Sequence, residues 1–179
     1  MAKTSFEYFK GKVKWFRPNQ LDAKYNKWTH VLYMDAPSVE KFRALQESTD
    51  DLAGIKNVLQ KDEDGYFARF SRPGSVERQG KVQGLNPPEI TDGSTVLPDG
   101  TNPPLRNVLV GNGSEVVTKV EVYTYPLRGT NGKRGRAMRW LSSRVDNLVP
   151  YEGRSDMTDR EEKAIRGLSD QPPAQEYYF

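Results

Sequence analysis

The chain has 179 residues, which suits one domain with appendages, and its hydrophobic content of 35% lies below the ~45–50% usual for a globular domain. It contains no cysteine and one histidine, which excludes disulfides and thiolate metal sites and removes most histidine-based catalysis. The net charge is +3, and acidic residues outnumber basic ones after residue 151, so a basic body with a mildly acidic tail fits a partner that is a polyanion.

Two segments near the start of the chain have side chains that alternate between two faces, which predicts a pair of strands. In residues 11–17 (GKVKWFR), Val13 and Trp15 fall on one face while Lys12, Lys14 and Phe16 fall on the other. Residues 27–35 (KWTHVLYMD) alternate in the same way. A polar loop lies between the two segments, so we expect the strands to pair.

A helix and a hairpin follow. Ser38 is predicted to be the helix N-cap, because Val39, Phe42 and Leu45 follow it with helical spacing. Residues 54–60 are then extended, and the pair Asp64-Gly65 is a strong hairpin signal that predicts a return strand over residues 66–72 (YFARFSR).

The second half of the chain contains a long insertion and two further strands. Residues 75–107 are rich in proline and glycine, which predicts an excursion with at most short strands, such as one near residues 88–92. A tight turn at 111–114 (GNGS) precedes the clearest strand, 115–125 (EVVTKVEVYTY). A glycine-rich basic loop, 128–136 (RGTNGKRGR), and a bent strand, 137–151, complete the pattern.

Five principal strands and one helix predict a mainly β protein with an OB-fold, a small and partly open Greek-key barrel. The helix is expected after the second strand rather than between the third and fourth. We assign residues 1–151 to this domain and residues 152–179 to a polar, mildly acidic C-terminal tail. Neither a signal-peptide core before Lys10 nor a segment of about 18 apolar residues is present, so no membrane partner is expected.

Aromatic and basic residues alternate on three of the predicted strands. Single-stranded nucleic acid is bound by rings that stack on bases and by cations that contact phosphates, so this pattern indicates binding of single-stranded DNA. The candidate DNA-binding residues are Lys12, Lys14, Trp15, Phe16, Tyr33, Tyr66, Phe67, Arg69, Arg72, Tyr123, Lys133, Arg134, Arg136, Arg139 and Trp140.

The face of the first strand is open to two interpretations. Solvation of Lys12 and Lys14 would place Phe16 outside and Trp15 inside. The string GKVKWF, however, resembles the opening of cold-shock domains, and that resemblance implies that Trp15 stacks on a base. The basic loop around Lys133 is similarly open, since it fits either a DNA backbone contact or a solvated hairpin tip.

Beyond this string, most of the chain up to Tyr151 resembles the single-stranded DNA-binding proteins of tailed bacteriophages. The resemblance rests on the order of GKVKW at 11–15, KDEDGY at 61–66 followed by Arg72-Pro73, PPEITD at 87–92, GNGS at 111–114 and the late strand 139–151. It implies an OB-fold, binding without strong sequence preference, and service to phage DNA replication or recombination in the host bacterial cytoplasm. It also implies that the aromatic end of the tail contacts phage replication or recombination proteins, and Tyr177, Tyr178 and Phe179 match that end.

Other functions fit the sequence less well. Asp62, Glu63 and Asp64 are a weak suggestion of a Mg²⁺ site, but in a hairpin they fit turn formation better, and His30 fits a satisfied, half-buried position. No P-loop or nucleophile elbow is present, so we expect no enzyme, no metal and no cofactor. The alternative is a phage structural or adaptor protein that acts through protein contacts. We expect the protein to be a monomer or a dimer.

Overall fold

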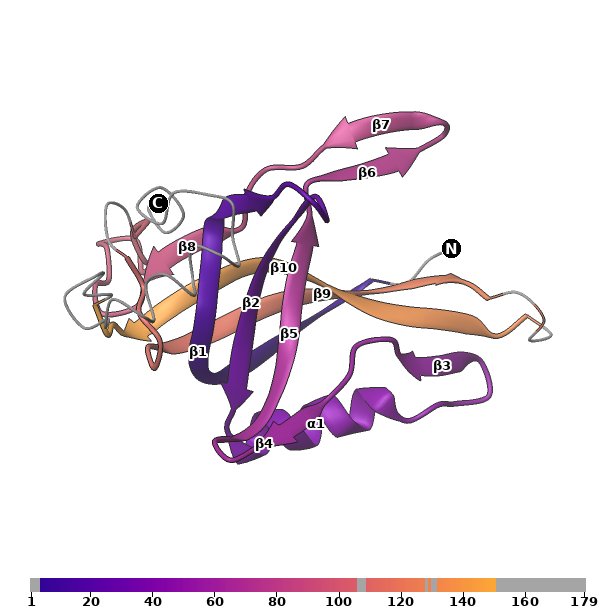
Figure 1. Ribbon diagram of the computed structural model, residues 1–179, viewed down its shortest axis with the longest axis horizontal. Helices are drawn as coiled ribbons and strands as arrows, with labels where there is room; N and C mark the ends of the chain where they lie inside the picture. The colour runs from indigo at the N-terminus through magenta and orange to yellow at the C-terminus, as the bar shows by residue number, and fades with distance from the viewer. Residues whose placement is uncertain (1–3, 106–108, 128, 130–131, 151–179) are drawn as a thin grey trace, which may run out of the picture.

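The computed structural model describes residues 4–105, 109–127, 129 and 132–150, and within these ranges the protein is mainly β with one helix, as the sequence predicts (Figure 1). The elements in chain order are β1 (Ser5–Asp22), β2 (Lys27–Met34), α1 (Ala36–Gln46), β3 (Leu52–Ile55), β4 (Gln60–Asp62), β5 (Gly65–Pro73), β6 (Ser75–Arg78), β7 (Lys81–Gly84), β8 (Glu89–Asp92), β9 (Glu115–Pro126) and β10 (Arg134–Asn147). The predicted tail, residues 152–179, lies outside the described residues.

The five long strands form a Greek-key barrel. β1, β2 and β5 make an antiparallel meander, and β9 returns to pair with the first half of β1, which gives the order β10-β9-β1-β2-β5. β5 and β10 lie against each other without a backbone ladder between these two described strands, and Arg72 Nη1 donates to the Trp140 carbonyl across the gap at 3.4 Å. This partly open barrel is the predicted OB-fold.

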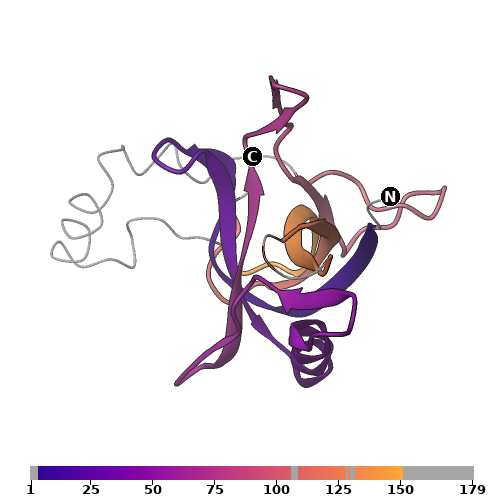
Figure 2. The same cartoon turned by 90° about the vertical axis from the view of Figure 1, so that its right-hand side faces the viewer.

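β1 is the strand that belongs to both layers of the barrel. Its first half pairs with β9 and its second half with β2, and Gly11 takes part in both pairings (Figures 1 and 2). A Cβ at Gly11 would overlap the carbonyl group of Tyr33, so only glycine allows this close approach of β2. The outward side chains of β1 therefore follow the barrel surface around a corner.

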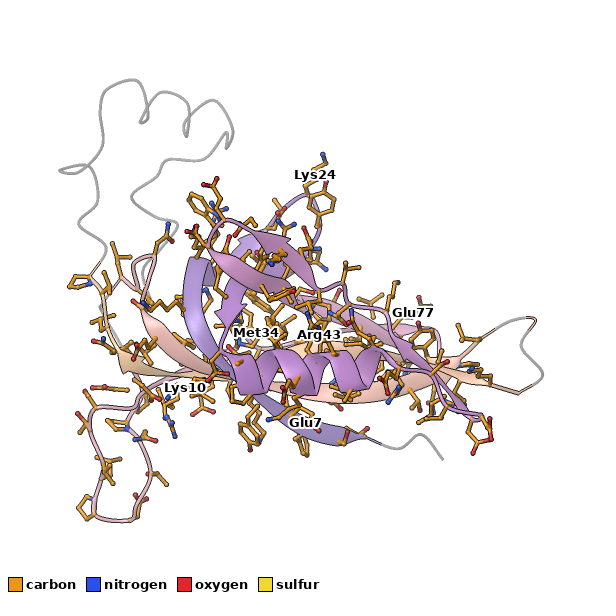
Figure 3. All side chains as sticks on the ribbon, turned by 90° about the horizontal axis from the view of Figure 1, so that it is seen from below. Glu7, Lys10, Lys24, Met34, Arg43 and Glu77 are labelled. Carbon is orange, nitrogen blue, oxygen red and sulfur yellow. The ribbon has the colours of Figure 1, made fainter. Side chains whose placement is uncertain are left out.

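The helix α1 follows β2, as predicted, and lies on the lower side of the barrel in Figure 1 (seen from below in Figure 3). Its N-cap is Asp35, whose Oδ1 accepts a hydrogen bond from the Ser38 backbone N–H at 3.0 Å. The prediction that Ser38 is the cap is wrong by one turn. Ser38 is buried instead, and its Oγ accepts the Lys10 backbone N–H at 2.9 Å, which ties the helix to β1.

Aromatic side chains and one polar network fill the barrel. His30 is fully buried rather than half-buried, with its ring 4.2 Å from that of Trp140 and 5.4 Å from that of Phe70. Its Nε2 lies 2.9 Å from Thr118 Oγ1, and Thr118 in turn contacts Ser143, which accepts the Trp140 Nε1–H at 2.9 Å. The network links β2, β9 and β10 through side chains at the centre of the core.

The proline-rich insertion contains more strand than the sequence indicates. β8 forms where a short strand is predicted and pairs parallel to β10, but the β6–β7 hairpin is an addition that stands off the barrel (Figure 1). Its turn residues Gln79 and Gly80 have φ values of 52° and 76°, so both occupy the left-handed region that two-residue hairpin turns require. The pair Gln-Gly is a weaker signal for such a turn than Asn-Gly or Asp-Gly. Among the described residues no helix is both long and apolar enough to cross a bilayer.

Burial lowers the pKa of His30 to about 3. An unfolded histidine titrates near 6.5, so below that pH protonation favours the unfolded chain. Stability should therefore fall as the pH decreases from about 6.5 towards about 3, with about 2 kcal/mol lost at about pH 5. Urea unfolding at neutral pH and at about pH 5 measures this loss. A His30→Gln variant should lose clearly less, and an equal loss in both proteins would show that other groups cause it.

Candidate nucleic-acid interface

The outer surface of the meander brings together candidate residues from three strands. Register places Lys12 beside Tyr33 and Tyr33 beside Phe67, while Lys14 and Arg69 flank Val31 in the next row. The surface formed by the outward side chains of these strands is called the meander face here, and it consists of Lys12, Lys14, Trp15, Tyr33, Phe67 and Arg69.

A β-bulge in β1 decides which aromatic residue belongs to the meander face. Trp15 has a φ of 53°. Lys14 pairs with Val31 and Arg17 with Thr29, so β1 advances by three residues where β2 advances by two. The extra residue leaves both Lys14 and Trp15 outside and returns Phe16 to the core. Trp15 is 51% exposed and Phe16 only 3%. The interpretation from simple alternation is therefore wrong, and Trp15 has the outward position that the cold-shock resemblance implies.

The predicted turn at 111–114 holds this bulge in place. Asn112 Oδ1 accepts the Trp15 backbone N–H at 3.0 Å, and the backbones of Gly113 and Ser114 bond to Val13 on either side. The left-handed conformation at Trp15 is unfavourable for a bulky residue, so these contacts from a distant part of the chain stabilise it.

Two predicted base platforms are core residues. Phe16 and Trp140 are 3% and 0% exposed, and their rings meet edge to face at 5.5 Å inside the barrel. A ring enclosed by other side chains has no free surface on which a base can stack. The prediction that Phe16 and Trp140 bind DNA is therefore wrong.

Tyr33 and Lys14 are the most densely connected pair on the meander face. Lys14 Nζ lies 4.7 Å from the centre of the Tyr33 ring and 2.8 Å from Asp64 Oδ2, and the Tyr33 ring lies 4.9 Å from that of Phe67. Tyr33 donates its hydroxyl hydrogen to Asp62 Oδ2 at 2.6 Å. The hydrogen bond from Tyr33 lowers the pKa of Asp62, and the one to Asp64 raises the pKa of Lys14, so Asp62 and Lys14 both stay charged at neutral pH.

The acidic β4–β5 turn thus has two roles. Asp62 Oδ1 accepts the Asp64 backbone N–H at 2.8 Å, as expected of a turn-forming residue. The remaining carboxylate oxygens reach the cation and the hydroxyl of the meander face. A hollow of about 310 Å³ opens beside them, lined by Lys12, Val13, Lys14, Tyr33, Asp64 and Gly113. Any anion that enters this hollow meets Lys14 already paired with Asp64.

Sequence reasoning missed the β1–β2 turn as part of this surface. Tyr25 is 61% exposed, and the Nζ atoms of Lys24 and Lys27 lie 5.2 Å and 5.3 Å from the centre of its ring. The turn lies at the end of the meander, where β1 and β2 meet (Figure 1). An aromatic residue between lysines, KYNK, was the signal that could have identified it.

Four further candidates lie away from the meander face. Tyr66 packs between the guanidinium of Arg43 on α1, at 4.7 Å, and Lys61 on β4. Arg72 donates from Nε to the Asn86 carbonyl at 2.8 Å and from Nη1 across the open side of the barrel. Tyr123 and Arg139 lie on the β9–β10 surface, where Arg139 stacks on Tyr123 at 4.8 Å and pairs with Glu121 at 3.5 Å.

The basic loop also differs from its prediction, because Arg134 and Arg136 belong to β10. Arg136 donates to the Ala53 carbonyl and to the carbonyls of Leu45 and Glu47 at the end of α1, at 2.7, 3.1 and 2.8 Å. It thereby satisfies helix-terminal acceptors, and its contact with a phosphate stays a prediction. Arg134 donates to Thr124 Oγ1, and Lys133 directly precedes β10, which extends with β9 beyond the other long strands (Figure 1).

No protein-family model matches the chain, and no curated protein matches it in sequence. Among solved structures it is similar to gp2.5, a single-stranded DNA-binding protein encoded by bacteriophage T7, with 14% identity, a TM-score of 0.49 and coverage of 86% of this chain and 92% of that one. It is also similar to the single-stranded DNA-binding protein from bacteriophage Enc34, with 10% identity, a TM-score of 0.45 and coverage of 87% and 89%. The same Enc34 protein in complex with single-stranded DNA matches at 6% identity and a TM-score of 0.45, over 83% and 89% of the two chains.

The bulge predicts that truncating two neighbouring aromatic residues changes the free energy of unfolding by very different amounts. Phe16→Ala should lower the free energy of unfolding by about 3–5 kcal/mol, because it opens a cavity beside His30 and Trp140. Trp15→Ala should change it by only about 0.5 kcal/mol, because half of that side chain is in solvent. Denaturant unfolding of the two variants measures both values, and similar losses would contradict the placement of Trp15 outside the core.

Proposed function

We propose that the protein binds single-stranded DNA, without strong sequence preference, across the meander face. The observation that supports this most is the row arrangement of that face, in which Trp15, Tyr33 and Phe67 stand among Lys12, Lys14 and Arg69. Stacking on an aromatic ring is worth about 1–3 kcal/mol per base and accepts any base, while the cations contact phosphates.

The chemistry of the face also favours unpaired strands over duplex. A ring can stack only on a base whose flat surface is exposed, and a duplex hides these surfaces inside its own stack. Reading base edges in a groove requires hydrogen-bonding groups held in fixed geometry, typically on a helix. α1 instead packs Val39 and Phe42 into the core, and Arg136 binds the carbonyls of its last turn.

We extend the proposal to the biological role on the strength of the sequence resemblance. Protection of single-stranded DNA during phage DNA replication or recombination, in the host bacterial cytoplasm, is the role that this resemblance implies. Contact of Tyr177, Tyr178 and Phe179 with phage replication or recombination proteins stays a prediction, since these residues lie outside the described part of the chain.

Fluorescence titration of a labelled oligonucleotide of about 16 nucleotides, single-stranded and duplex, tests the proposal. Single-stranded DNA should bind more tightly, and affinity should fall steeply with salt. Trp15→Ala should weaken binding by about 1–3 kcal/mol, and Arg69→Gln should reduce the salt slope by about 0.7. Lys56→Gln, an exposed lysine outside the meander, is the matched control. Equal losses in control and test variants, or no binding by the unmodified protein, would refute the proposal.

The acidic β4–β5 turn predicts a gain in binding when one of its charges is removed. Asp64→Asn frees Lys14 to neutralise a phosphate, so affinity should rise by about 1 kcal/mol and the salt slope should steepen by about 0.7. The pair is exposed, so the stability of the fold should hardly change. Asp99→Asn removes the same charge from the insertion and serves as the control. An unchanged salt slope in Asp64→Asn would show that Lys14 does not reach the DNA.

A further inference from the structure

The first half of β1 carries a second set of exposed rings. Alternation places Phe6, Tyr8 and Lys10 on the same outward side as Lys12, while Phe9 is buried in the core. Phe6 is 53% exposed and Tyr8 51%, so neither ring is needed to fill the barrel. These rings lie before the corner at Gly11, whereas the meander face lies after it.

A lysine from the neighbouring strand completes this set. Register pairs Tyr8 with Lys119 of β9, and Lys119 Nζ lies 4.7 Å from the centre of the Phe6 ring and 5.9 Å from that of Tyr8. On the meander face, Lys14 Nζ likewise lies 4.7 Å from the centre of the Tyr33 ring. A cation above an outward-facing ring thus occurs on both sides of the corner. The N-terminal patch is defined here as Phe6, Tyr8 and Lys119.

Lysines connect the two surfaces along the strand. Lys10 and Lys12 lie between the N-terminal patch and Lys14, and no carboxylate of the described residues forms an ion pair with Lys10, Lys12 or Lys119. Glu7 alternates to the other side of β1, where its carboxylate lies 3.9 Å from Lys41. The outward line of β1 is therefore positively charged from Lys10 to Lys14, with rings at both ends.

We propose that the path of single-stranded DNA continues around the corner at Gly11 and that the N-terminal patch is a second stacking subsite. This inference rests on the function proposed above and extends it. Phe6 and Trp15 are nine residues apart, so the two ends of the path are separated by about 30 Å measured along the strand. An unpaired strand is flexible enough to follow the bend, and a polyanion complements the unpaired lysines between the rings. An uncharged protein surface would gain from the rings but would leave those charges unmatched.

The double variant Phe6→Ala/Tyr8→Ala tests the inference with oligonucleotides at the two ends of the OB-fold range, about 4 and about 16 nucleotides. A short oligonucleotide on the meander face cannot reach the patch, so its affinity should be unchanged. The long one should bind at least about fivefold more weakly. Val82→Ala, an exposed apolar residue on β7, is the control for surface truncation, and its affinity should match that of the unmodified protein.

Two further measurements keep the inference testable if the double variant folds poorly. Lys119→Gln should reduce the salt slope for the long oligonucleotide by about 0.7 and leave the short one unaffected. Iodouracil-containing long oligonucleotides should photocrosslink to Phe6 or Tyr8 of the unmodified protein.

The outcomes separate this inference from the proposed function. Unchanged affinity for the long oligonucleotide, or equal weakening for both lengths, overturns the second subsite while the meander face stands. If neither oligonucleotide binds the unmodified protein, both proposals fail. If the double variant instead converts a dimer to a monomer in sedimentation equilibrium with DNA affinity unchanged, the patch is a self-association surface and the inference is overturned.

Discussion

Burial of the inward side chains of β1 is the constraint on which the rest of the structure depends. Phe9, Val13 and Phe16 all reach the core, although simple alternation would put Phe16 on the opposite side from the other two. The bulge at Trp15 allows all three side chains to be buried. Its extra residue shifts the alternation of β1 by one position, so that Phe16 also points into the core. The exposed position of Trp15, next to Lys14 on the meander face, is a consequence of that packing.

An anion that approaches the meander face competes with carboxylates that are already bound there. The carboxylates of Asp62 and Asp64 lie within hydrogen-bonding distance of Tyr33 and Lys14, so a phosphate has to replace contacts that already exist. Because these groups are exposed, each pair contributes little to stability and can exchange readily. In the proposed function, this arrangement opposes indiscriminate anion binding, and stacking on the rings supplies the preference for unpaired bases.

Two arginines that look like DNA contacts in the sequence also bind backbone carbonyls within the fold. Arg136 binds three carbonyl groups near the end of α1, and Arg72 bridges β5 to β10 where no ladder closes the barrel. A guanidinium group has five N–H donors in a planar fork, which suits clusters of backbone carbonyls as well as phosphates. Lysines, whose ammonium groups are compact point charges, supply more of the positive charge on the two proposed DNA surfaces.

The sequence by itself determined the five principal strands, the helix after β2, the Asp64-Gly65 hairpin and the mainly β barrel, because alternation and turn chemistry are local properties. It also identified Lys12, Lys14, Tyr33, Phe67 and Arg69, whose outward directions follow from that alternation. Only the tertiary structure decided between Trp15 and Phe16, since the contact from Asn112 that supports the bulge comes from almost a hundred residues away. It likewise decided that Trp140 fills the core and that Phe6 and Tyr8 stand beside Lys119, because these contacts depend on which strands become neighbours.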